Sequence, residues 1–162
     1  MLDRHIELFV REKAGETRHS GRTFFEHLMG TYDLLVAQGA PVYVCLAGLC
    51  HSIYGTNAFK HASVPASERK SVIDAIGPKA ERLAWIFCAC RRPMALVDAF
   101  VSGEPYQVIN RHSGEAIDLS RRELLDLLTI EVANLVEQDA VRSRVFPLVV
   151  DAQQAMREAA DA

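Results

Sequence analysis

Apolar residues recur with the period of an α-helix along almost the whole chain. Their spacing at the N-terminus predicts an amphipathic helix over residues 2–15, which a glycine ends. A second helix is expected over residues 23–39, and a third, almost wholly apolar helix over residues 41–51. Because the third segment has no polar face, we expect it to lie near the centre of the fold.

The second half of the chain continues the helical pattern, with one interruption. Helices are expected over residues 67–76 and 79–90, from Ser120 through Val136, and near Pro147. Pro93 is expected to end the helical stretch before it. Between Pro93 and Ser120, two short runs of alternating apolar and polar residues flank a His-Ser-Gly turn. They predict a β-hairpin over residues 105–119.

These elements predict a single all-α domain over residues 1–162, a helical bundle with one small β-hairpin insertion. A chain of 162 residues is long enough for one hydrophobic core, and 49% hydrophobic residues argue against disorder. Its four cysteines have neither CxxC spacing nor the density of a disulfide scaffold. They are therefore expected to be reduced and buried.

Charge and hydropathy restrict the class of partner. A net charge of −3 gives no basic field for a phosphate backbone, so we expect no nucleic-acid partner. No apolar run reaches the length of a membrane span, and we expect a cytoplasmic protein with no membrane partner. Small-molecule ligands or protein partners fit this composition better, and a homodimer is compatible with it.

Two histidines on consecutive apolar helices carry the most evident chemistry. His27 follows Glu26 on the second helix, and His51 precedes Ser52 at the end of the third. A lone histidine on an apolar helix is more often a packed core residue than a functional one. Small residues flank both imidazoles at helical spacing, which permits close helix crossing and also leaves space beside the rings. We therefore expect the pair to form a pocket.

Four short stretches resemble the HD superfamily, and more specifically the hydrolase domain of RelA/SpoT-type guanosine polyphosphate enzymes. They are Arg18-His19-Ser20-Gly21 ahead of Phe25-Glu26-His27, Ala47 to His51, Ile76-Gly77-Pro78, and Ile130 to Leu135. The resemblance spans roughly residues 11–138 and implies an HD-domain-like fold. It also implies that His27 and His51 bind a divalent metal and that Arg18 stacks on a nucleotide base.

Where the resemblance implies carboxylates, this sequence has neutral residues. Ser52 stands in the place of the Asp of the HD pair, and Asn134 in the place of a second metal-binding Asp. Gly55-Thr56 stands in the place of an auxiliary acidic pair. Hard cations such as Mg²⁺ and Mn²⁺ depend on oxygen anions, so we expect a degenerate metal site and no cofactor.

A site for a softer metal is the alternative. A divalent transition metal such as zinc accepts neutral imidazoles, and His27 and His51 would hold it together with His19 or His61.

Other polar residues are expected to contact a ligand in the same pocket: Arg18, Ser52, Tyr54, Asn134 and Gln138. Tyr54 follows His51 by three residues and is equally compatible with packing. Asn134 and Gln138 lie four apart on one helix face, where buried amides need hydrogen-bond partners. The adjacent Arg91-Arg92 pair is interpreted as solvated surface.

Three functions remain open at this point. The preferred one is an HD-like enzyme that acts on a small metabolite without the standard divalent metal, with His27 and His51 as acid and base catalysts. The second is a non-catalytic module that binds a small molecule or a nucleotide. The third is a metal-dependent phosphohydrolase with altered ligands.

Overall fold

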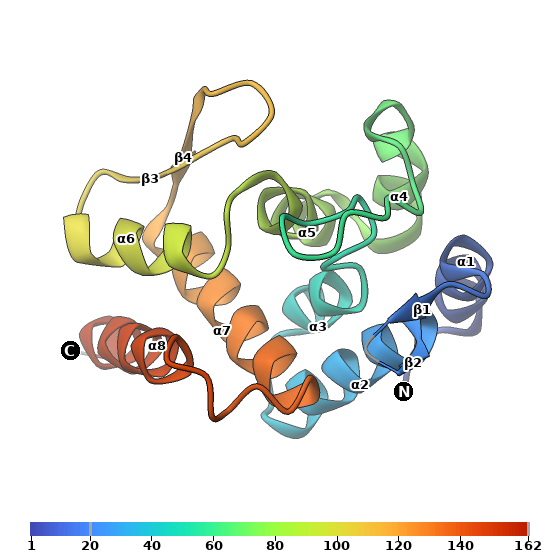
Figure 1. Cartoon of the computed structure of the whole chain (residues 1–162), viewed down its shortest axis with the longest axis horizontal. Helices are drawn as coiled ribbons and strands as arrows, with labels where there is room; N and C mark the ends of the chain where they lie inside the picture. Colours follow the sequence, from blue (N-terminus) through green and yellow to red (C-terminus); the bar gives the residue numbers. More distant parts are fainter. Residues whose placement is uncertain (20, 162) are drawn as a thin grey trace.

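The computed structural model describes residues 1–19 and 21–161, and it is mostly helical (Figure 1). Ser20, part of the first stretch that resembles the HD superfamily, lies outside the described residues. The elements, in chain order, are α1 (Arg4–Ala14), β1 (Arg18–His19), β2 (Arg22–Thr23), α2 (Phe24–Ala37), α3 (Val42–Leu49), the 3₁₀ turn η1 (Ala66–Glu68), α4 (Arg69–Ile76), α5 (Pro78–Ala89), α6 (Met94–Ser102), β3 (Tyr106–Ile109), β4 (Ala116–Leu119), α7 (Arg121–Glu137) and α8 (Phe146–Asp161). The prediction of an all-α fold with a small β-hairpin is confirmed.

Side-chain caps explain where the two helices of the site begin. The Thr23 hydroxyl accepts from the backbone N–H of Glu26, whose carboxylate accepts in return from the Thr23 N–H, and α2 starts there. Ser120 and Glu123 make the same reciprocal pair at the start of α7. These caps satisfy N–H groups that have no partner inside the helix, and the sequence predicts both helix starts.

Helix α7 crosses the middle of the bundle. Every residue from Leu124 to Leu135 is buried, and the helix packs against α2, α3, α5, α6 and α8 (Figure 1). Helix α3 lies against α2, α5 and α7, so the apolar helix expected at the centre shares that position with α7. Because these helices share the centre, the start of α2 lies close to the end of α3 and to the end of α7.

Helix α3 is shorter than predicted, and His51 follows it. The helix ends at Leu49, Cys50 caps it, and His51 lies in the turn beyond. Gly48 is required by the close approach of α2, because a Cβ at this position would overlap Leu35 Cδ1. Thus the space beside Gly48 is filled by Leu35, and this small residue serves helix packing.

Two features of the fold differ from the prediction. Helix α6 begins immediately after Pro93, which we interpreted only as a stop, although proline is also well tolerated at a helix start. A second antiparallel hairpin joins β1 to β2, with Arg18 opposite Thr23 and His19 opposite Arg22. Its strands have two residues each, too few for an alternating pattern to be visible.

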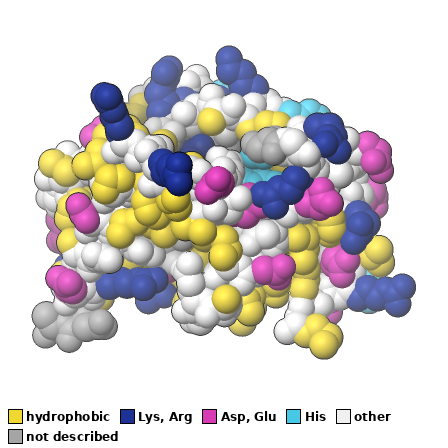
Figure 2. All heavy atoms as spheres, turned by 60° about the horizontal axis from the view of Figure 1, so that its bottom comes forward, with side chains coloured by type: hydrophobic (Ala, Val, Ile, Leu, Met, Phe, Trp, Pro, Cys, Tyr) yellow, Lys and Arg dark blue, Asp and Glu magenta, His cyan; other side chains and the backbone are white. Residues whose placement is uncertain are grey.

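The predicted hairpin is present at residues 106–119, where Tyr106 pairs with Leu119 and Ile109 with Ala116. All four cysteines are free and buried, as expected. Among the described residues, none of the helices combines the length and apolarity needed to cross a bilayer. On the face shown in Figure 2, basic and acidic side chains are interspersed, so this face carries no uniformly basic surface.

Candidate functional site

The two histidines singled out by the sequence meet in the core. His27 lies on α2 and His51 follows α3, and their Nε2 atoms are 3.0 Å apart. The rings meet edge to face, with centroids 4.9 Å apart. Both side chains are almost fully buried, at 1% and 0% exposure. The fold therefore joins residues 24 positions apart into one pair.

The other ring nitrogen of each histidine faces an acceptor. His51 Nδ1 donates to the backbone carbonyl of Gly48 at 2.6 Å, and His27 Nδ1 contacts the Glu137 carboxylate. With hydrogens on both Nδ1 atoms, a neutral ring carries a lone pair on Nε2. The two Nε2 lone pairs then face each other, and neither ring supplies a hydrogen between them.

Asn134 adds a third acceptor at the same place. Its Nδ2 donates to Glu131 at 3.3 Å, and its Oδ1 accepts from Gln138 Nε2 at 3.2 Å, which fixes the orientation of the amide. Asn134 Oδ1 consequently faces His51 Nε2 at 3.1 Å. When both rings carry their hydrogen on Nδ1, three lone-pair atoms gather here without a hydrogen-bond donor among them, an arrangement that a cation would satisfy.

Burial keeps both imidazoles uncharged at neutral pH. Desolvation lowers the pKa of His27 to about 2, reinforced by the neighbouring His51 and His19. Desolvation also lowers the pKa of His51 to about 4, against the opposing effect of its hydrogen bond to Gly48. Neutral imidazole is the form that binds metal ions.

Glu137, at the end of α7, is a site residue that the sequence analysis did not select. Its side chain is 3% exposed and contacts both His27 Nδ1 and the Arg22 guanidinium. Desolvation raises the pKa of this carboxyl, and Arg22 opposes the rise. The carboxylate packs over Gly30, where a Cβ would lie 2.8 Å from Glu137 Oε1. The sequence shows that Glu137 follows Asn134 by three residues on the same helix. It does not show that Glu137 contacts His27 on another helix.

Neither additional histidine completes a three-imidazole set with the pair. The His19 ring stacks on His27, with centroids 4.1 Å apart and planes 14° apart, so it presents its face to His27. His61 is exposed, and its Nε2 lies 3.4 Å from Thr17 Oγ1. Within the residues described, no three His, Cys, Asp or Glu side chains gather as a metal-binding group. The third donor beside the pair is the Asn134 amide.

A polar cavity of about 280 Å³ lies next to the histidine pair. Four of the predicted ligand-contacting residues line it: Arg18, Ser52, Asn134 and Gln138. Asn134 connects the cavity to the buried pair, because it contacts His51 as well. The remaining lining comes from His19, Thr56, Ala58, Phe59 and Arg92. Thus the predicted residues are brought together, while His27 and His51 lie behind the cavity wall.

Tyr54 belongs to a separate cluster. Its hydroxyl donates to Glu81 at 2.7 Å, and Arg69 binds the same carboxylate through two nitrogens. The residue does not line the cavity beside the pair. The position of Tyr54 therefore agrees with the packing alternative and not with contact to a ligand in this cavity.

The interpretation of Arg91-Arg92 as solvated surface is wrong for Arg92. Arg92 is 7% exposed, lines the cavity and donates through Nε to Glu131 at 2.7 Å. A second guanidinium nitrogen also contacts Glu131, which is fully buried. Sequence does not show which of two adjacent arginines is buried, because the partner of Arg92, Glu131, belongs to another helix. Arg91 is exposed, as expected.

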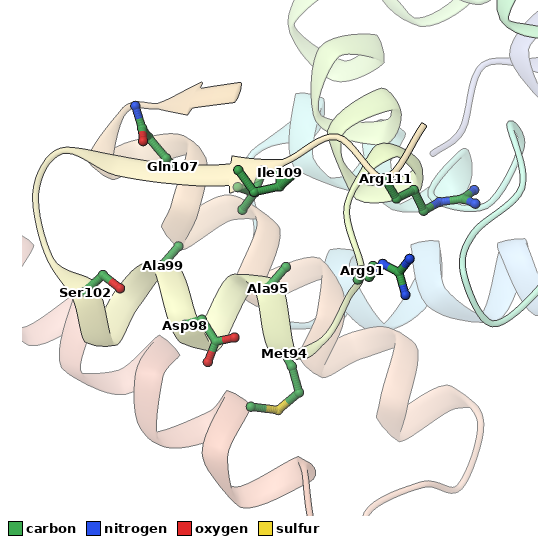
Figure 3. A pocket seen from close by; sticks show the side chains of 10 residues that line it. Arg91, Met94, Ala95, Asp98, Ala99, Ser102, Gln107, Ile109 and Arg111 are labelled. Carbon is green, nitrogen blue, oxygen red and sulfur yellow. The ribbon is translucent and has the colours of Figure 1, made fainter. Parts of the chain in front are cut away.

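A larger cavity of about 410 Å³ lies between α6 and β3 (Figure 3). None of the site residues expected from the sequence lines it. Figure 3 shows Arg91 and Arg111 near one end, with Ala95 and Ala99 on the side of α6 that faces β3. It is therefore distinct from the histidine site.

Comparisons with known proteins place the chain in a family. The family described as a domain of unknown function, DUF6817, matches residues 8–92, just over half of the 162 residues. The matched segment contains His19, His27 and His51 but ends before α7, which supplies Asn134 and Glu137. No curated protein and no solved structure matches the chain. The chain belongs to the DUF6817 family.

Proposed function

We propose that the protein is an HD-like enzyme that acts on a small metabolite in the cavity beside the histidine pair. We propose further that His27, His51 and Asn134 hold a divalent transition-metal cation there, in place of a carboxylate-bound metal. The supporting observation is the convergence of the two Nε2 atoms, 3.0 Å apart, with Asn134 Oδ1, 3.1 Å from His51 Nε2.

The donor set fits an imidazole-preferring cation such as Zn²⁺. Ligand nitrogens about 2.0–2.1 Å from one tetrahedral metal ion lie about 3.3–3.4 Å apart, so the two Nε2 atoms at 3.0 Å need to separate by only a few tenths of an ångström to bind it. Metal-binding histidines usually donate their other N–H to a carboxylate or a backbone carbonyl. Glu137 and Gly48 accept from His27 and His51 in this way. When bound, such a cation supplies Lewis-acid chemistry and activates water.

The same donor set does not fit a hard cation such as Mg²⁺ or Mn²⁺. These ions require oxygen anions, and the nearby carboxylates are committed to other partners. Glu131 is bound by Arg92, and Glu137 is bound by Arg22 and His27. The site is therefore proposed without the standard carboxylate-bound metal, and the softer cation, given above as the alternative to a site without cofactor, is proposed in its place.

The cavity lining favours a small anionic metabolite. Arg18 supplies a guanidinium that makes no ion pair with the described residues, and no carboxylate lines the cavity. Arg92 is neutralised by Glu131. A volume of about 280 Å³ is at the lower limit of common ligand pockets, which favours a compact ligand over a guanosine polyphosphate.

Metal binding tests the proposal directly. We expect chelator-treated protein to bind one equivalent of Zn²⁺ or Co²⁺ in calorimetry, with a visible absorption band for Co²⁺. The variants His27→Gln and His51→Gln lose this binding, and Glu137→Gln weakens it about 10–100-fold because the His27 orientation is lost. The matched control His61→Gln binds like the wild type. Wild-type protein that binds neither ion at micromolar concentration contradicts the proposal.

Metal-free acid and base catalysis by His27 and His51 is the second candidate. It is favoured because the three converging atoms, His27 Nε2, His51 Nε2 and Asn134 Oδ1, include no carboxylate oxygen. A proton abstracted from a substrate is then shared between the two facing Nε2 atoms as an N–H···N hydrogen bond.

A turnover assay separates the two candidates. We expect wild-type protein, screened by NMR against a panel of small carboxylates and phosphomonoesters, to convert at least one member. If the pair acts without metal, chelator leaves kcat unchanged, while His51→Gln lowers it by about 10²–10⁴-fold with ligand binding retained. Loss of turnover with chelator supports the metal site. Binding without turnover by any form assigns the cavity to a non-catalytic module.

A further inference from the structure

The cavity between α6 and β3 borders the open edge of a β-strand. Among the described residues, strand β3 pairs only with β4 in a two-stranded sheet, so its other edge has no partner strand there. Gln107, Val108 and Ile109 of this strand line the cavity. Figure 3 shows the strand running along α6, with the two elements on opposite sides of the cavity.

The pairing register identifies which backbone groups face outward. Asn110 N–H donates to the Glu115 carbonyl at 2.8 Å, so these two residues form a hydrogen-bonded pair. Such pairs alternate along an antiparallel ladder, which turns the N–H and C=O groups of Gln107 and Ile109 away from β4. Arg111 is next in this alternation, and its outward N–H donates to Ala89 O at 2.8 Å.

Gln107 and Ile109 have no such partner for these backbone groups among the described residues. The unpaired edge therefore begins at Gln107 and stops where Arg111 is bonded to α5. It offers two donors and two acceptors, the pattern that an added strand would satisfy.

The side chains around this edge match an extended peptide that ends in a carboxylate. Ala95 and Ala99 give α6 a shallow apolar wall on the side that faces β3, whereas Asp98, which also lines the cavity, lies on the side of α6 away from β3 (Figure 3). Ile109 is 54% exposed. At the end near Ile109, the exposed Arg91 makes no ion pair with any described residue. The neighbouring Arg111 guanidinium donates to the backbone carbonyls of Cys88 and Gly55. Arg91 is thus the available cation.

We propose that this cavity is a docking site for an extended peptide, which adds as a strand to the Gln107–Ile109 edge and places its C-terminal carboxylate at Arg91. Backbone hydrogen bonds hold the peptide, and the apolar wall of α6 contacts its alternate side chains. The site is separate from the histidine cavity and needs no metal.

A single strand fits this edge better than a second copy of the chain. Only residues 103–105 connect α6 to β3, so a hairpin from another copy would bring its own α6 against the first. Edge-to-edge pairing of two copies is obstructed by this short connection. A peptide without a neighbouring helix meets no such obstacle.

NMR titration of the ¹⁵N-labelled full chain tests the site. The probes are a panel of acetylated tetrapeptides with alternating Thr and Val, Ile or Leu, each with a free carboxylate or as its amide. We expect saturable shifts of the Gln107 and Ile109 amides, and about fivefold weaker binding of the amides. Arg91→Gln removes that fivefold difference. Ile109→Pro, which lacks the outward N–H, weakens binding about tenfold, while Ile109→Thr retains it.

The spectrum of Ile109→Pro away from the hairpin serves as the folding control. No saturable shift at Gln107 and Ile109 with any peptide overturns the proposal, as does equal binding by a folded Ile109→Pro variant. Self-association of the free chain that Ile109→Pro abolishes in sedimentation overturns it in favour of a second copy as the occupant.

Discussion

We expect Arg92→Leu to lower the free energy of unfolding by about 3–5 kcal/mol, because the change leaves the Glu131 carboxylate buried without its counter-charge. Glu131 is fully buried, and Arg92 contacts it through two nitrogens. A carboxylate in this position has lost its hydration, and Asn134 supplies only one further hydrogen bond at 3.3 Å. Urea unfolding followed by circular dichroism measures the change.

Two controls isolate the cost of the uncompensated charge. The double variant Arg92→Leu with Glu131→Leu is expected to recover most of the stability, because both charges are removed together. Arg82→Leu breaks the more exposed pair with Glu123 and is expected to cost less than about 1 kcal/mol. Equal stability of Arg92→Leu and wild type would show that Glu131 does not depend on Arg92.

The second large effect is expected from pH. Metal-free protein should lose stability as the pH falls from 6.5 toward 4, since the folded pKa values of His51 and His27 are lowered to about 4 and about 2. In this range the unfolded chain takes up protons on both imidazoles and the folded chain does not. Each histidine contributes a slope of up to about 1.4 kcal/mol per pH unit. The stabilisation is complete above pH 6.5 and declines below it.

Nearby titratable groups modify this slope. The lowered pKa of His19, caused by burial and then by Arg22 and Arg92, acts in the same direction. The raised pKa of Glu137 acts in the opposite direction, because the folded state then binds a proton first. The net slope is therefore expected to be smaller than the sum for the histidines.

Urea unfolding between pH 4 and pH 7.5 in chelator measures the slope. His51→Gln is expected to reduce it, and the exposed His112→Gln leaves it unchanged. Stability that rises as the pH falls to 5 would show that the folded pair already holds a proton. That result would favour the metal-free candidate over the metal site.

The sequence predicts the helices well because their signals are local. Both capping boxes, at Thr23 and Ser120, place a helix start within a few residues of the groups that it satisfies. Helix α6 escaped prediction because proline both ends and begins helices, and only its burial against α7 and α8 shows which applies. The two-residue strands β1 and β2 are too short to leave a pattern.

Residues of the candidate site were likewise predicted where their signal is local and missed where it depends on contacts between distant elements. Sequence selected His27, His51, Asn134 and Gln138, because imidazoles and amides on apolar helix faces need a reason to be there. It missed Glu137 and interpreted Arg92 as surface, since both roles depend on partners from other elements. It also placed Tyr54 near the pocket by spacing alone, whereas Glu81 holds its hydroxyl elsewhere.

The sequence by itself therefore determined the helical class, the helix starts at the two capping boxes, the choice of His27 and His51 as candidate site residues, and the neutral residues at positions where the HD resemblance implies acids. Those properties are written in residue type and in spacing along one helix. The tertiary structure alone decided which lone pairs converge, which carboxylates are already committed and which strand edge is open. These depend on ring orientation, burial and pairing register, which are fixed only when segments far apart in the chain pack together.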